Sequence, residues 1–141
     1  MPIPMEYHHA GRDFDAFMAD LLEISLLKTR HQAYTMLQAV LQVFRRRLTL
    51  AEAIAFANLL PPVVRAIFVS DWDTTEPQRP FADRETLMAE VRQLRHNHNL
   101  STPTAIEDVT STLRRHVDAA RLEALLRQLP EGALAFWGFT D

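Results

Sequence analysis

The chain has 141 residues, 48% of them apolar and 23% charged, a composition typical of one soluble globular domain or of two tightly packed half-size units. Its formal charge of −3 argues against non-specific nucleic-acid binding, and the lack of cysteine excludes disulfides, thiolate nucleophiles and cysteine zinc sites. Because it has no membrane-spanning apolar run and no secretory signal, we expect a cytoplasmic protein without membrane contact.

Residues 1–12 contain two prolines, a histidine pair and a glycine, and they predict a flexible N-terminal arm. Helical periodicity follows, with a first amphipathic helix expected near 13–27. Thr29 and Gln32 have the spacing of a capping box and predict the start of a second helix. That helix is apolar around much of its circumference, so we expect it at the centre of the fold.

Thr49 and Glu52 form a second capping-box pair and predict a third helix. Pro61 suits the first turn of a fourth helix, because a first-turn residue needs no N–H donor. Residues 71–81 then concentrate Asp, Thr and Pro and are the predicted linker, in which Trp72 is the one large aromatic side chain before Phe81.

The second half repeats this order of elements. A helix is expected near 83–96, and three more should begin after Thr102, after Asp118 and at Pro130. The prolines and the Asp cap supply the start signals for these later helices.

A shift of 69 residues aligns the two halves without a gap over residues 40–68. The match brings together Val40 and Val109, Arg45-Arg46 and Arg114-Arg115, Leu60-Pro61 and Leu129-Pro130, and Phe68 and Trp137. Chance matching of amphipathic helices is the alternative explanation. We predict an all-α fold of two pseudo-repeated four-helix units, residues 13–70 and 82–141, packed into one compact helical body.

A signature segment runs through the first half. Its residues are Ala39–Ala53 (AVLQVFRRRLTLAEA), Leu59-Leu60-Pro61-Pro62, Ile67-Phe68 and Asp71-Trp72, and a looser copy is Leu125–Pro130 with Phe136-Trp137. On these residues the chain resembles the bacterial family catalogued as domain of unknown function 2267, from about Phe14 to Trp137. The resemblance implies a small all-helical protein of two related halves without an established activity. Ser25-Leu26-Leu27 departs from the pattern where a glycine is expected, and Leu87 stands where it favours Phe.

Two pairs of arginines and two tryptophans are the candidate partner-binding residues. Arg45 and Arg46, with Arg114 and Arg115 as the second copy, are suited to an acidic partner or a phosphate. The alternative is that these arginines complement helix dipoles while their stems cover apolar surface. Trp72 and Trp137 would mark an interface if exposed, and the alternative is that each closes the core of its own half.

Six histidines raise the question of a metal site. His96 and His98 are two residues apart, and His8 and His9 lie in the arm. No HExxH pair or dense carboxylate cluster accompanies them, so we expect solvated histidines, no metal and no cofactor. Glycine-rich phosphate loops and nucleophile elbows are also missing, and we predict no catalytic residue.

These observations favour a non-enzymatic helical interaction or regulatory module that binds a protein partner or itself. One alternative is nucleic-acid binding through a short helix pair at 49–68, with Arg45–Arg47 on the phosphate backbone. Pro61-Pro62 argues against it, because a recognition helix exposes Arg, Asn or Gln near its start. The further alternative is a metal or small-ligand protein that uses the scattered histidines.

Overall fold

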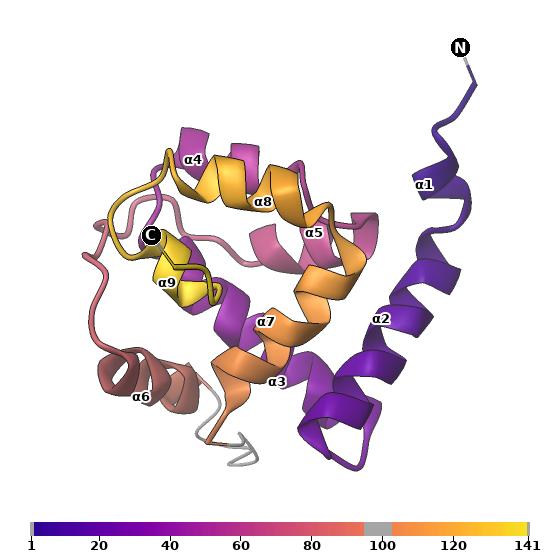
Figure 1. Ribbon diagram of the computed structural model, residues 1–141, viewed down its shortest axis with the longest axis horizontal. Helices are drawn as coiled ribbons and strands as arrows, with labels where there is room; N and C mark the ends of the chain where they lie inside the picture. The colour runs from indigo at the N-terminus through magenta and orange to yellow at the C-terminus, as the bar shows by residue number, and fades with distance from the viewer. Residues whose placement is uncertain (1, 95–102, 141) are drawn as a thin grey trace.

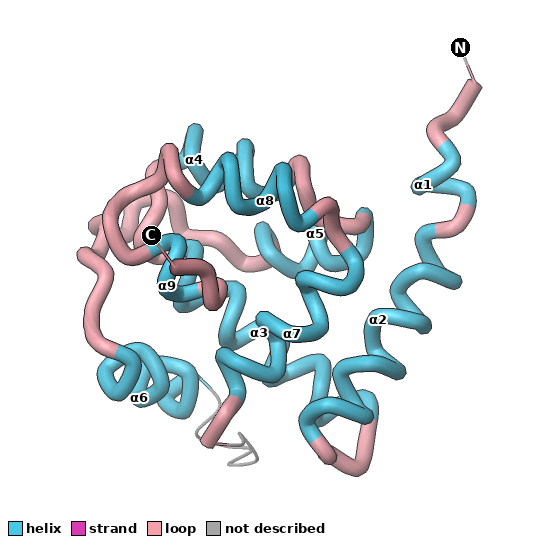
Figure 2. Tube along the Cα trace, viewed as in Figure 1, coloured by secondary structure: helices cyan, strands magenta, loops and turns pink. Residues whose placement is uncertain are grey.

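The computed structural model describes residues 2–94 and 103–140, and over these residues every regular element is a helix (Figures 1 and 2). This confirms the predicted all-α class. The helices are α1 (Met5–His8), α2 (Ala10–Ser25), α3 (Arg30–Arg45), α4 (Leu50–Ala57), α5 (Pro62–Val69), α6 (Arg84–Leu94), α7 (Ala105–His116), α8 (Ala119–Leu126) and α9 (Ala133–Phe136).

Helix α3 is the central element, as its apolar circumference predicts. Its start has the predicted capping box: Thr29 Oγ1 accepts the Gln32 N–H at 3.2 Å, and the Gln32 side chain accepts the Thr29 N–H at 3.3 Å. Helices α2, α5, α6 and α7 all pack around α3. Its fully buried side chains include Met36, Leu37, Val40, Leu41 and Phe44.

The first and second halves of the chain share one core. Helix α2 packs against α7 more extensively than any other pair of helices in the described residues. The ring of Phe44 on α3 lies 4.8 Å from that of Phe56, 5.0 Å from that of Phe136 and 5.2 Å from that of Trp137. Neither half therefore encloses its apolar side chains alone.

The observed helices differ from the predicted ones mainly at their ends. Helix α2 begins at Ala10, inside the predicted arm, and α5 begins at Pro62 with Pro61 as its N-cap. Helix α9 begins after Gly132, later than predicted from Pro130. Gly132 has φ 106°, and a Cβ at this position would lie 2.5 Å from a Phe81 side-chain atom. The chain therefore makes a turn that suits glycine at this residue, and α9 begins after it. The expected start after Thr102 lies outside the described residues.

Helices α4 and α8 have the same length and lie 69 residues apart at both ends. Their N-caps, Thr49 and Asp118, are 69 residues apart as well. Asp118 accepts the N–H of Arg121 at 3.2 Å, as Thr49 accepts that of Glu52. These matches support the duplication, which stays a prediction, as does the linker at 71–81.

Thr49→Ala is expected to lower the free energy of unfolding by about 1 kcal/mol. Thr49 Oγ1 accepts the Glu52 N–H at 3.2 Å, and Glu52 Oε1 accepts the Thr49 N–H at 2.8 Å, so the predicted capping box is present. Urea unfolding measures the loss. Thr49→Ser keeps the hydroxyl and should retain most of the stability; equal losses in both variants would contradict the capping role.

Leu26→Gly is expected to stabilise the protein by about 0.5–1 kcal/mol. Leu26 caps α2 in the left-handed region at φ 61°, and its side chain is 85% exposed and contributes little packing. A side chain in this region costs about 1–2 kcal/mol, which the entropy cost of glycine offsets only in part. Leu26→Ala keeps the strained Cβ, so thermal unfolding should show a gain for glycine alone.

Candidate interaction cleft

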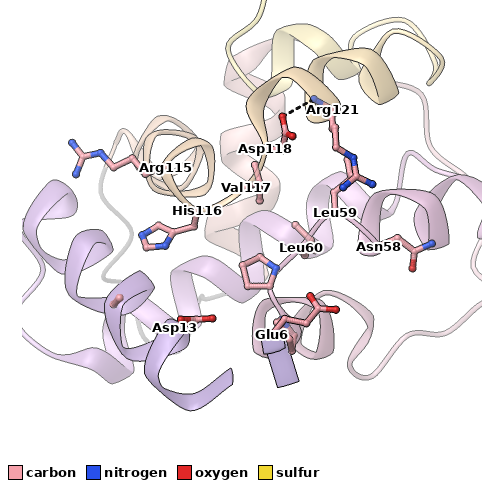
Figure 3. Close-up of a pocket in the computed structure, with 13 residues that line it drawn as sticks. Glu6, Asp13, Asn58, Leu59, Leu60, Arg115, His116, Val117, Asp118 and Arg121 are labelled. Carbon is pink, nitrogen blue, oxygen red and sulfur yellow. Dashed lines mark hydrogen bonds between the residues drawn. The ribbon is translucent and has the colours of Figure 1, made fainter. Parts of the chain in front are cut away.

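An open cleft of about 470 Å³ lies where α1 and α2, the α4–α5 turn and the start of α8 meet (Figure 3). Its lining comes from both predicted repeats. The apolar part of the lining includes Leu59, Leu60, Pro61, Pro62 and Val117. Leu60 is buried and the other four are half-buried, so the cleft offers apolar surface beneath a charged rim.

His116, the last residue of α7, forms one wall of this cleft. Its Nε2 lies 2.7 Å from Asp20 Oδ2 on α2, and its ring packs at 5.1 Å from that of Phe17. The contact fastens α7 of the second half to α2 of the first. A histidine at a helix C-terminus complements the helix dipole when it is protonated, and here it also joins two helices.

The charged rim has carboxylates on several sides and one arginine that faces them. Glu6 lies 3.7 Å from Arg65, and Asp118 caps α8. Figure 3 shows the Arg121 side chain extending from α8 toward Leu59 and Asn58. Its guanidinium makes no hydrogen bond or ion pair with a described residue, so it is available to an acidic group.

The first candidate arginine, Arg45, is buried and binds backbone. Its Nη1 donates to the carbonyl oxygens of Phe68 and Ser70, each at 2.9 Å, and its guanidinium lies 5.1 Å from the centre of the Trp72 ring. Burial lowers the pKa of Arg45, and the neighbouring charge of Arg46 lowers it further. Arg45, the last residue of α3, therefore holds the end of α3 to the end of α5, and its contact with half-buried Trp72 holds it to the linker.

Arg47, with 2% of its side chain exposed, is paired inside the protein with Glu90 of α6. It also donates to the carbonyl oxygens of Val43 and Pro80. Arg46 and Arg79 reach the same Glu90 Oε1 at 3.3 and 3.1 Å. We name Arg46, Arg47, Arg79 and Glu90 the Glu90 cluster, which ties α3, α6 and the linker together.

Glu90 is ionised by this environment despite its burial. Burial alone would raise the pKa of Glu90, but the hydrogen bond and charge of Arg47, with the charge of Arg79 and a hydrogen bond from Arg46, hold it below its ordinary value. Since Arg45 and Arg47 are both buried, this geometry does not support the alternative that Arg45–Arg47 contact nucleic acid.

The second-copy arginines are on the surface. The Arg114 guanidinium lies 4.1 Å from the centre of the Phe139 ring, and Arg114 Nη1 donates to the Gly138 carbonyl at 3.4 Å. Arg115 contributes to the cleft lining, but in Figure 3 its side chain extends away from the other labelled residues. The aligned pairs Arg45-Arg46 and Arg114-Arg115 thus have different environments.

Trp137 is fully buried, in agreement with its interpretation as a core residue. Its ring stacks on that of Phe56 at 5.6 Å and an angle of 21°. Its Nε1 has no hydrogen-bond partner among the described residues. A partner cannot reach Trp137 on the surface of this structure.

The histidines fall into different places. His8 ends α1 and His9 links α1 to α2, whereas His96 and His98 lie outside the described residues. Within residues 2–94 and 103–140, no group of three or more His, Asp or Glu side chains is arranged to hold a metal ion.

Glu90 and Arg121 were missed by reasoning from the sequence. Glu90 lies on the buried face of α6 with Leu87, Met88 and Val91. A carboxylate on such a face implies a cationic partner, although not which one. Arg121 gives no such signal, because its importance comes from the α2–α8 cleft, whose lining residues are far apart in the sequence.

The fold and the site define a small all-helical protein with a mixed-charge surface cleft and the Glu90 cluster. A model of the family described as an uncharacterized conserved protein (DUF2267) matches residues 14–136. The chain therefore belongs to this family, which confirms the resemblance. No curated protein matches the sequence. None of the described helices is long and apolar enough to cross a membrane.

Proposed function

We propose that this chain is a cytoplasmic, non-enzymatic interaction or regulatory module that binds a segment of a partner protein in the cleft between α2 and α8. The observation that carries the proposal is the cleft itself, an open volume of about 470 Å³ with apolar lining and a charged rim. Interfaces commonly combine an apolar centre with a polar margin in this way.

Charge favours a partner segment with an acidic group beside an apolar one. The guanidinium of Arg121 is free to bind a carboxylate through two parallel hydrogen bonds, and Leu59 and Val117 offer apolar contact nearby. Glu6 and Asp13 on the opposite side would repel a uniformly acidic segment and so orient the acidic end toward Arg121.

The cleft chemistry also favours binding over catalysis. A His–Asp pair such as His116 and Asp20 orients a general base in many hydrolases. However, the cleft lining contains no Ser, Thr or Cys side chain that such a base would activate as a nucleophile. His116 instead holds α7 against α2.

The test is a comparative pull-down from lysate of the source organism, with and without nuclease, using wild type, Arg121→Glu and Arg92→Glu. Arg121→Glu reverses the free charge in the cleft, and Arg92 is an exposed arginine on α6 that does not line it. We expect a nuclease-resistant protein that wild type and Arg92→Glu retain and Arg121→Glu loses at least tenfold. Retention by all three, loss on nuclease treatment, or no retained protein would overturn the proposal.

A further inference from the structure

A small pocket, which we call the α3–α4 pocket, lies between the end of α3, the start of α4 and the linker. Its lining includes Arg45, Thr49, Leu50, Trp72 and Glu76. Its volume is about 150 Å³, well below the roughly 300–1,000 Å³ of pockets that hold drug-sized molecules. The pocket therefore suits a ligand of only a few heavy atoms.

Arg45 is a buried cation of this pocket without a carboxylate partner. Its neighbours Arg46, Arg47 and Arg79 all form ion pairs with Glu90. Arg45 is only 7% exposed, yet it forms no ion pair with a described residue. An unpaired charge inside a protein is costly, so a buried cation normally has a counter-anion. The environment of Arg45 thus favours an anion beside it.

The free hydrogen-bond donors of Arg45 lie on one edge of its guanidinium group. Both of its hydrogen bonds come from Nη1, which donates to the carbonyl oxygens of Phe68 and Ser70. Nε and Nη2 donate to no described residue, and neither is among the fully enclosed polar atoms that lack a partner. Two parallel N–H groups on one edge are the arrangement that binds a carboxylate or a phosphate group through two hydrogen bonds.

The start of α4 favours the same charge. Thr49 and Leu50, the N-cap and first residue of α4, both line the pocket. Thr49 Oγ1 accepts the N–H of Glu52, while the N–H groups of Leu50 and Ala51 have no acceptor within the helix. The partial positive charge of a helix N-terminus attracts anions. The helix start and Arg45 are therefore two independent features that suit one anion.

The carboxylates near the pocket do not neutralise Arg45. Glu76 Oε1, in the described lining, lies 3.2 Å from Arg79 and 3.6 Å from Arg46. Burial and the charge of Arg46 lower the pKa of Arg45, and the charges of Glu76 and Asp71 offset this only in part. A bound anion would supply the compensation that these carboxylates do not.

We infer that the α3–α4 pocket binds a small oxyanion, a carboxylate or a phosphate group, through the free edge of Arg45 and the start of α4. The small volume admits such a group, whereas burial of Arg45 keeps a nucleic-acid backbone away from it. This site goes beyond partner binding in the α2–α8 cleft and shares no described lining residue with it.

Titration with sodium acetate and with sodium phosphate, each followed by nuclear magnetic resonance, tests this inference. Each salt replaces sodium chloride at constant ionic strength and pH 7. The ring of Trp72 lies 5.1 Å from Arg45 Cζ, so its indole N–H signal should shift and saturate with at least one anion. The signal of fully buried Trp137 should stay in place and serves as the internal control. The tighter-binding salt shows whether the natural ligand carries a carboxylate or a phosphate group.

Leu50→Asp should weaken binding at least tenfold, because it places a negative charge in the pocket. An acidic residue in the first turn suits the helix dipole, so the fold should be retained. Ile54→Asp is the matched control, since Ile54 is 52% exposed, Leu50 is 53% exposed, and Ile54 lies one turn further along α4 outside the lining. Leu50→Asn tests the change of shape without the charge. Both of these variants should bind within twofold of wild type.

No saturable shift of the Trp72 signal with either anion, or equal weakening by Leu50→Asp and Ile54→Asp, would overturn the inference. Circular dichroism verifies that each variant folds. None of these substitutions replaces a residue of the α2–α8 cleft, so the Arg121 pull-down tests the proposed function separately.

Discussion

Glu90→Gln is expected to lower the free energy of unfolding by about 3 kcal/mol. Removing one partner of a buried ion pair leaves the other charge uncompensated, which costs about 3–5 kcal/mol. We expect the lower end, because Arg47 keeps its hydrogen bonds to the carbonyl oxygens of Val43 and Pro80 after Glu90 is replaced. Guanidinium chloride unfolding at pH 7 measures the difference.

The same variant should change how stability depends on pH. The pKa of Glu90 is lower in the folded protein than its ordinary value of 4.5. Its stabilising contribution is therefore complete above pH 4.5 and is lost as the pH falls through the lowered pKa. Wild type should lose stability more steeply than Glu90→Gln below about pH 4.5.

Glu107→Gln is the matched control for both measurements. Glu107 pairs with Arg84 at 3.7 Å, and its side chain is half exposed, so its loss should cost less than about 1 kcal/mol. If Glu90→Gln were no less stable than Glu107→Gln and had the wild-type pH profile, the Glu90 cluster would not have the structural role assigned to it.

Trp137→Ala is expected to cost about 3–5 kcal/mol, the range for removing a large aromatic side chain from a packed core. The ring contacts Phe44, Phe56 and Phe136, which lie on three different helices, so the cavity cannot close by moving one element. Urea unfolding should show a lower midpoint.

Trp137→Phe separates ring packing from hydrogen bonding. Trp137 Nε1 has no partner among the described residues, so its removal breaks no known hydrogen bond and relieves a buried donor. We expect a clearly smaller loss than for alanine. Equal losses would show that the indole nitrogen is bound in solution.

Local signals in the sequence predict the elements of this fold well. The hydroxyls of Thr29 and Thr49 and the carboxylate of Asp118 cap helices where their spacing predicts, because capping depends on residues within one turn. Helix α9 begins after Gly132 and not at Pro130, and local signals do not predict this, because Gly132 lies close to Phe81, a residue far away in the sequence.

Long-range packing decides the roles of the candidate residues, and sequence periodicity does not contain that information. The arginine run predicts charge at a helix end, yet Glu90, which pairs with Arg47, lies 43 residues away. Burial of Trp137 was an open alternative, because an aromatic residue near the end of a chain suits a core and an interface equally. The cleft itself depends on how α2 meets α7.

The shared core has a consequence for experiments that cut the chain. The exposed residues Thr74 and Thr75 lie between α5 and α6, while Arg79 N–H donates to the Arg46 carbonyl and fastens the next part of the linker to the first half. A break between the threonines would leave two fragments whose apolar faces still require each other. The protein is thus a natural candidate for a split reporter, in which reassembly of two separately expressed pieces restores the native state.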